Sequence, residues 1–320
     1  MSIAFTFPGQ GSQKVGMGKE LAESFPAAKA VFDEVNDALD QKLTVLMWDG
    51  PAQDLQLTEN AQPAIMAVSM AVVRVLDQEF GITVENTAKF VAGHSLGEYS
   101  ALAAAGTFSL ADTARLLKIR GRAMQAATPV GTGAMAALLG LDFDAAVEVA
   151  NEAAKGGDAD DVCQAANDNA PGQVVVSGSK AAVERACIIA KEKGAKRAIM
   201  LPVSAPFHCS LMVPAADAMA EALANVEMLA PKVPLVANVS TNQLIDPIKI
   251  SRSLVTQVTG TVRWRESVGK MADDGITTFL ELGAGKVLTG MVRRNAPDAK
   301  GLAIGMPDDF AKVTEELQKK

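Results

Sequence analysis

The sequence has few of the residues that mark several common protein classes. Cysteine occurs three times in 320 residues, at Cys163, Cys187 and Cys209. The odd number and wide spacing fit neither a metal site nor a disulfide framework, so we expect reduced thiols. No run approaches the roughly 18 to 20 uninterrupted apolar residues of a membrane-spanning helix, and no basic leader precedes the first expected strand. These absences predict a cytoplasmic protein without a membrane partner.

Aromatic residues are also scarce, at 4% of the chain, although 49% of the residues are apolar. This composition favours helices packed on a sheet over an all-β protein. The formal net charge of −7 argues against a nucleic-acid partner. Nucleotide-binding loops are missing as well: the glycine-rich turn at residues 8–13 has Lys14 where GxGxxG needs its third glycine, and GxxxxGK[ST] does not occur.

A glycine-flanked serine is the strongest local signal. Residues 89–92 predict a short apolar strand, and a helix of small residues is expected after Tyr99. Between them, Gly93 and Gly97 flank Ser95 at the spacing of a nucleophile elbow, a sharp turn that exposes the serine hydroxyl. The first N–H groups of the helix can stabilise an oxyanion there. Ser95 is therefore the candidate nucleophile, and the alternative is an ordinary Gly-Ser loop that caps a helix.

The search for a general base is short because the chain has only two histidines. His94 adjoins Ser95, and adjacent side chains at the end of a strand point apart, so His94 is poorly placed to reach the hydroxyl. His208 lies on a proline-containing loop that is distant in sequence and can approach in space. The alternative is a hydrogen-bonded loop histidine. Cys209, beside His208, does not lie in a nucleophile elbow, and we expect it to be buried and to take no part in catalysis.

One arginine lies on the wrong face of a predicted helix. Ser109 is expected to cap a helix that runs to about residue 127, and three-and-four spacing places Arg120 in the apolar stripe with Leu116 and Met124. A guanidinium there is costly unless it meets an anion, and its geometry matches a carboxylate. Two hypotheses remain open: a clamp for an acidic substrate, or a structural ion pair with a protein carboxylate.

Other segments predict the domain organisation. We expect a helix over residues 18–39, a loop over 51–57 and a long helix that begins at Gln62 and Pro63. After a linker at residues 129–133, the order strand, helix, strand, strand, helix, strand up to residue 201 is that of a ferredoxin-like unit. The sequence thus predicts a small domain, 129–201, inserted into a larger one made of 1–128 and 202–320.

Several motifs occur together in an order that is far more specific than the elbow alone. They are FPGQGSQ at 7–13, AGHSLGEY at 92–99, RGR at 120–122, FH at 207–208, NDNAPGQ at 167–173 and GAGKVL at 283–288. With them, the chain resembles the malonyl-CoA:acyl carrier protein transacylases of fatty-acid synthesis over nearly its full length. The resemblance implies an α/β-hydrolase-like large domain with an inserted ferredoxin-like domain, and a site in the cleft between them.

The resemblance also implies roles for individual residues. Ser95 would be acylated, His208 would act as general base and acid, and Arg120 would hold the malonyl carboxylate. Backbone N–H groups of Gln10 and Leu96 would bind the oxyanion. The backbone carbonyl of Gln257 would orient His208 in place of a triad acid. Only the roles of Ser95, His208 and Arg120 also follow from the residues themselves.

The expected activity is an S-malonyltransferase that works by a ping-pong mechanism and needs no metal or other cofactor beyond the CoA thioester itself. The expected partners are malonyl-CoA and an acyl carrier protein, and the chain is expected to be a monomer. Basic side chains are candidates for docking an acidic carrier, namely Lys191, Lys193, Lys196, Arg197, Lys286 and Arg293.

Two other functions remain open. One is a serine esterase or thioesterase, but such hydrolases usually place their histidine near the C-terminus, whereas more than a hundred residues follow His208 here. The other is a noncatalytic acyl-carrier or CoA-binding module, against which the presence of both Ser95 and His208 counts.

Overall fold

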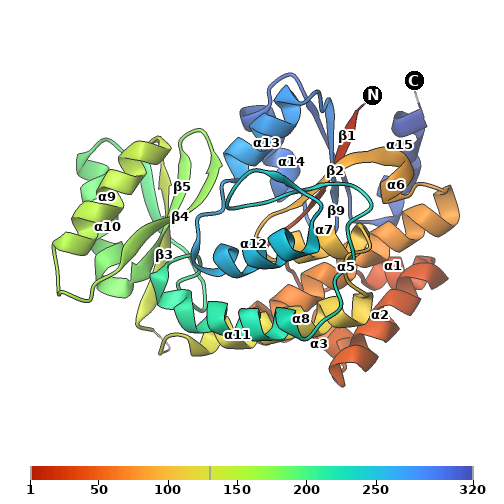
Figure 1. Cartoon of the computed structure of the whole chain (residues 1–320), viewed down its shortest axis with the longest axis horizontal. Coiled ribbons are helices and arrows are strands. Elements are labelled where there is room, and N and C mark those ends of the chain that lie inside the picture. The colour runs from red at the N-terminus through yellow and green to blue at the C-terminus, as the bar shows by residue number, and fades with distance from the viewer. Residues whose placement is uncertain (1, 130, 319–320) are drawn as a thin grey trace.

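The computed structural model describes residues 2–129 and 131–318, and within them the chain forms two separate β-sheets (Figure 1). Met1, Val130 of the expected linker, and Lys319 and Lys320 lie outside the described residues. The larger sheet has the spatial order β10 (Lys300–Ile304), β9 (Thr278–Leu282), β1 (Ile3–Phe7), β2 (Ala88–Gly93), β7 (Leu235–Val236), β8 (Gln243–Leu244). Its strands are parallel except for β8, which pairs antiparallel with β7.

The larger sheet is covered on both faces, as the complete burial of its central strand β1 requires. Alternate residues of β1 point to opposite faces: Phe5 and Phe7 join one apolar cluster, and Ala4 joins another. The first cluster includes residues of α2 (Pro26–Leu39), α5 (Thr58–Phe80), α7 (Gly97–Ala104), α8 (Leu110–Ala126), α11 (Val213–Ala224) and α12 (Pro247–Thr259). The second includes residues of α13 (Trp264–Asp273) and α14 (Val287–Asn295).

Six further elements complete the described part of this larger domain. They are α1 (Lys19–Ser24), α3 (Leu43–Asp49), α4 (Ala52–Gln56), α6 (Val84–Thr87), the 3-10 turn at Ser210–Met212 and α15 (Pro307–Gln318). Helix α15 packs against β10 and α1, so the last helix of the chain lies close to the first (Figure 1). Among the described residues, none of the helices combines the length and the apolar character that a membrane crossing needs.

The smaller sheet has the order β4 (Cys163–Ala170), β5 (Gln173–Ser179), β3 (Gly133–Leu139), β6 (Arg197–Met200), with every pairing antiparallel. Helices α9 (Phe143–Lys155) and α10 (Lys180–Glu192) pack on one face, against Val174 and Val176. Val175 points the other way and joins the cluster of the larger sheet. The predicted α/β fold class and the ferredoxin-like element order are confirmed, and 129–201 remains our proposal for the extent of the inserted domain.

Three sequence expectations about local structure were wrong. The helix expected over 18–39 is divided into α1 and α2, because Phe25 is extended and Pro26 starts a new helix, where its missing N–H costs nothing. The loop expected over 51–57 contains α4. The helix expected from Gln62 begins at Thr58, so Pro63 lies inside α5 rather than in its first turn. At this interior position the missing N–H of Pro63 removes one backbone hydrogen bond of the helix.

Candidate functional site

Ser95 occupies a strained turn between β2 and α7. Its φ of 53° is in the left-handed region, which non-glycine residues rarely adopt. A Cβ atom at Gly93 would lie 1.9 Å from the Gly97 carbonyl, and one at Gly97 would lie 2.3 Å from the Phe7 carbonyl oxygen. Only glycine fits at these two positions, so β2, the turn and α7 have the tight geometry of a nucleophile elbow. We use "the elbow" for residues 93–97.

The loop after β1 packs against the elbow. A Cβ atom at Gly9 would lie 2.6 Å from the His94 carbonyl oxygen, so the backbone of this loop approaches the turn closely. Gln10 follows directly, and its side chain accepts a hydrogen bond from Thr58 at 2.9 Å. Within residues 2–129 and 131–318, the backbone N–H groups of Gln10 and Leu96 donate no hydrogen bond. They are thus available to a ligand, as the oxyanion role requires.

The structure brings His208 to Ser95 across 113 residues of sequence. The Nε2 atom lies 2.7 Å from Ser95 Oγ, and Nδ1 lies 2.9 Å from the Gln257 carbonyl oxygen. Because a carbonyl can only accept, Nδ1 carries the proton and Nε2 is free to accept from the serine hydroxyl. Burial and the neighbouring Arg120 lower the pKa of His208 to about 3, so the imidazole is neutral at physiological pH.

The other histidine takes no part in this pair. His94 Nε2 lies 2.8 Å from Asn169 Oδ1, on β4 of the smaller sheet, and its ring contacts Trp264. The expectation that the two adjacent side chains diverge is therefore met. This contact also shows that the elbow lies where the larger and smaller sheets meet. Cys209 is fully buried and its thiol donates to the Pro206 carbonyl, away from Ser95.

Arg120 is 1% exposed and points at the same serine. Its Nη2 lies 3.2 Å from Ser95 Oγ and 2.8 Å from Gln257 Oε1, and its Nη1 lies 2.8 Å from Gln62 Oε1. None of the carboxylates in the described part of the chain forms a salt bridge with it. The structural ion pair considered from the sequence is therefore not formed, and a full positive charge is held by neutral oxygen atoms beside the nucleophile.

Comparison with known proteins identifies the family. A model of the acyl transferase domain matches residues 4–304. The chain belongs to the acyl transferase family. It is 45% identical over 316 residues to the malonyl CoA-acyl carrier protein transacylase of Bacillus subtilis, with 99% of this chain and 97% of that protein covered. The relative of the same name in Escherichia coli strain K12 is 45% identical over 313 residues, covering 98% of this chain and 99% of that one.

Solved structures of the family have the same fold. The acyl-carrier-protein-S-malonyltransferase of Bartonella henselae is 57% identical and superposes with a TM-score of 0.95, with 99% of each chain covered. A malonyl-transacylase solved in complex with its type II PKS acyl-carrier protein is 40% identical, with a TM-score of 0.94, and 99% of this chain and 100% of that chain are covered.

Three polar residues of this acyl transferase site escaped sequence reasoning as functional candidates. Asn238 accepts from the Ser95 N–H at 2.8 Å and donates to the Gly93 carbonyl at 2.7 Å, which secures the elbow. Gln62 contacts Arg120, as described above. Glu98, 0% exposed, accepts from the Gln257 side chain at 2.6 Å. Burial raises the pKa of Glu98 to about 7. Gln62 is a buried amide at an ordinary helical position and Asn238 lies in a turn after β7, so neither has a sequence signature, whereas Glu98 lies within the AGHSLGEY motif.

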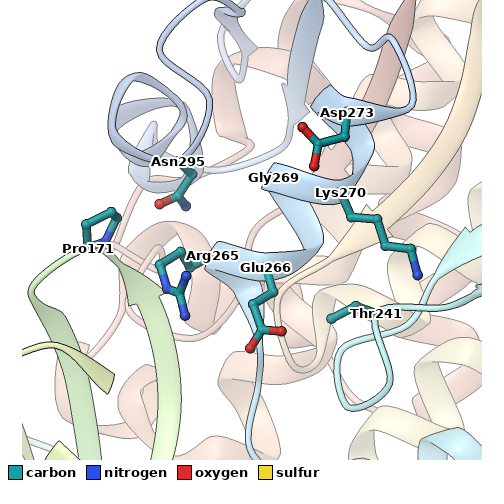
Figure 2. Close-up of a pocket in the computed structure, with 8 residues that line it drawn as sticks. All are labelled: Pro171, Thr241, Arg265, Glu266, Gly269, Lys270, Asp273 and Asn295. Atoms are coloured by element: carbon teal, nitrogen blue, oxygen red, sulfur yellow. The ribbon is translucent and has the colours of Figure 1, made fainter. Parts of the chain in front are cut away.

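A pocket at the junction of the two sheets lies apart from these residues (Figure 2). It is lined mainly by α13, with Pro171 after β4 and Asn295 at the end of α14. None of the predicted site residues lines it. In the described part of the acyl transferase chain, no three His, Cys, Asp or Glu side chains form a group that could hold a metal ion.

Proposed function

We propose that the chain transfers a malonyl group from malonyl-CoA to the phosphopantetheine thiol of an acyl carrier protein, through a malonyl ester on Ser95. The names of its relatives state this activity for them. The observation that carries the proposal is the buried Arg120 guanidinium, 3.2 Å from Ser95 Oγ and without a protein carboxylate to pair with in the described residues. An acyl group that ends in a carboxylate supplies the missing anion.

In the first half-reaction, the Ser95 oxygen attacks the thioester carbon while His208 Nε2 takes the hydroxyl proton. The carbonyl oxygen becomes an oxyanion, which we assign to the N–H groups of Gln10 and Leu96. Collapse of the tetrahedral intermediate breaks the carbon–sulfur bond. The CoA sulfur leaves and receives the proton from His208, so the enzyme retains only the ester.

In the second half-reaction, the thiol of the carrier's phosphopantetheine loses its proton to His208 and attacks the ester carbon. The Ser95 oxygen leaves and regains that proton. The Gln257 carbonyl, 2.9 Å from His208 Nδ1, holds the ring in the required tautomer in both halves and stabilises the transient imidazolium. No step calls for a metal or an additional cofactor.

Selectivity follows from the cost of leaving Arg120 unmatched. Malonyl places its carboxylate against the guanidinium, whereas acetyl and longer acyl chains leave a buried charge without an anion. We therefore propose that malonyl is preferred over acyl groups that lack the carboxylate.

The carrier protein is a proposed partner, consistent with the relative that was solved with its acyl-carrier protein. Of the basic side chains considered for docking, Lys193 lies 2.9 Å from Glu152 and Lys286 lies 3.8 Å from Asp309. We therefore place more weight on the other four, which are exposed: Lys191, Lys196 and Arg197 at and near the edge strand β6, and Arg293 in α14.

The test is incubation of the purified protein with malonyl-CoA, and separately with acetyl-CoA, followed by rapid quenching and intact mass measurement. We expect a malonyl-sized adduct on the parent and none on Ser95→Ala. Arg120→Ala should acylate with malonyl about 100-fold more slowly and lose its preference over acetyl. Release of CoA without an adduct would favour the hydrolase instead, and neither adduct nor CoA release would contradict the catalytic proposal.

A further inference from the structure

Glu98 is a fully buried carboxyl that the mechanism above does not use. It lies in the first turn of α7, three residues after Ser95, and is 0% exposed. Its Oε2 accepts from the side-chain amide of Gln257 at 2.6 Å and from the Asn238 N–H at 3.4 Å. Its Oε1 has no hydrogen-bond partner in the described part of the chain. A buried carboxyl is costly and calls for an explanation.

The contact with Gln257 leads directly to the arginine. The amide Nε2 of Gln257 donates to Glu98 and, at 3.0 Å, to the Ser95 carbonyl, while Oε1 accepts from Arg120 at 2.8 Å. An amide has one accepting end and one donating end. If it turned over, its oxygen would face two acceptors and its NH₂ group would face a guanidinium. Glu98 therefore stabilises the one orientation in which Gln257 can hold Arg120.

The indirect connection has a chemical consequence. A carboxylate placed directly on Arg120 would compete with a substrate carboxylate for the same N–H groups. Glu98 is separated from Arg120 by one amide, so it orients the guanidinium without occupying it. The accepting oxygen is present in both the ionised and the neutral carboxyl, so the contact with Gln257 does not depend on the protonation state of Glu98.

We propose that Glu98 is a positioning residue for acyl-group selection: through the side-chain amide of Gln257, it holds the Arg120 guanidinium where it meets the carboxylate of the acyl group on Ser95. This inference rests on the proposed function, because it assigns Glu98 to the same malonyl-binding site. It gives Glu98 no contact with the reacting atoms.

The test compares acylation of Ser95 by malonyl-CoA and acetyl-CoA in Glu98→Met, which keeps the side-chain length and removes both oxygen atoms. We expect the malonyl rate to fall by about 10- to 100-fold, as for a misplaced binding group, and the acetyl rate to change by less than about threefold. Glu98→Gln retains an oxygen that can accept from Gln257, and it should restore most of the malonyl preference.

The matched control is Glu281→Gln. Glu281 is also buried, at 1% exposed, but its carboxylate accepts from backbone N–H groups of Leu288 and Thr289 in α14, far from Arg120 in the hydrogen-bond network. Its loss should lower the thermal stability while leaving the ratio of malonyl to acetyl rates unchanged. A fall in melting temperature alone therefore does not account for a change of ratio.

A double-mutant comparison tests the route through the amide. In a Gln257→Met background, Glu98→Met should change the malonyl-to-acetyl ratio by less than about twofold, because the connection is already broken. If Glu98→Met does not fold, Gln257→Met alone tests the connection, and it must lose the preference for malonyl over acetyl.

The proposal for Glu98 is overturned if folded Glu98→Met keeps the parent ratio of malonyl to acetyl acylation rates, or if both rates fall by the same factor. It is also overturned if Gln257→Met keeps that ratio. Failure of the parent protein to form a malonyl adduct overturns the proposed function itself, so the two failures are distinguishable.

Discussion

His208 and Arg120 both lie against Ser95 Oγ, and the charge of one affects the other. The guanidinium disfavours a second positive charge nearby, which adds to the effect of burial on the pKa of His208. The unprotonated Nε2 at 2.7 Å is thus kept ready to accept the serine proton. A substrate carboxylate on Arg120 would reduce that repulsion, so the base becomes stronger when the matching acyl group is bound.

The chain has only two histidines, so their titration can be followed directly. Burial lowers the pKa of His94, and burial with Arg120 lowers the pKa of His208 to about 3. We predict that the ¹⁵N imidazole signals of His208 stay in the neutral form from pH 8 to pH 5, that His94 titrates below its ordinary pKa, and that Arg120→Ala raises the pKa of His208. A midpoint near the ordinary value of 6.5 for His208 in the parent would contradict this prediction.

The same pKa shift affects folding stability. In the unfolded chain His208 binds a proton near pH 6.5, whereas the folded protein resists protonation down to about pH 3. The unfolded state therefore binds more protons between these values. The contribution of His208 to the free energy of unfolding is present above pH 6.5 and is lost progressively as the pH falls towards 3.

At the scale of secondary-structure elements, the elbow depends on close approach between β1, β2 and α7. Phe7 ends β1, and its carbonyl oxygen accepts from the His94 N–H at 3.0 Å. The start of α7 packs on that same carbonyl, where the missing side chain of Gly97 leaves the necessary space. The position of Ser95 is therefore fixed by two parallel strands and one helix together.

We predict that Gly97→Ala lowers the free energy of unfolding by at least about 2 kcal/mol, because its Cβ would lie 2.3 Å from the Phe7 carbonyl oxygen. The control is Gly290→Ala in the interior of α14, where a Cβ would meet no atom within 4 Å. That change should stabilise the protein by about 0.5–1 kcal/mol. Urea unfolding of both variants measures the difference. Equal effects of the two substitutions would show that the elbow tolerates a side chain.

At the scale of the whole molecule, β4 of the smaller sheet is attached to the segment before α13. Val262 donates to the Ala166 carbonyl at 2.8 Å and accepts from the Asp168 N–H at 2.9 Å. The buried Asp168 carboxylate also accepts from Arg265 of α13, with Nη2 2.7 Å from Oδ2. Arg265 is among the residues of the junction pocket (Figure 2). These contacts join the two sheets beside the elbow.

Arg265→Met should lower the free energy of unfolding by about 1–3 kcal/mol, because it leaves the Asp168 carboxylate, whose side chain is 1% exposed, without its charged partner. Lys193→Met serves as the control, because Lys193 pairs with Glu152 at the surface, where the side chains are 38% and 56% exposed. Its expected cost is below about 1 kcal/mol. Chemical denaturation compares the two, and similar losses would mean that the Asp168 pair does not help to hold the sheets together.

Local patterns in the sequence determined the elbow, the place of Arg120 in the apolar stripe of its helix, and the order of the strands and helices that form the smaller sheet and its cover. Each of these depends on residues close together in the chain, whose spacing sets the geometry. Proline did not locate the helix starts, because both Pro26 and Pro63 permit a start but of the two only Pro26 begins a helix.

Only the tertiary structure decided how Arg120 is held. Its partners Gln62 and Gln257 lie 58 and 137 residues away on other helices, and Glu98 acts on it only through the second of them. Hydrogen-bond partners of buried amides depend on how the helices pack, and no period or motif in the chain encodes that. The sequence therefore determined which residues could react, and the packing decided which neighbours hold them in place.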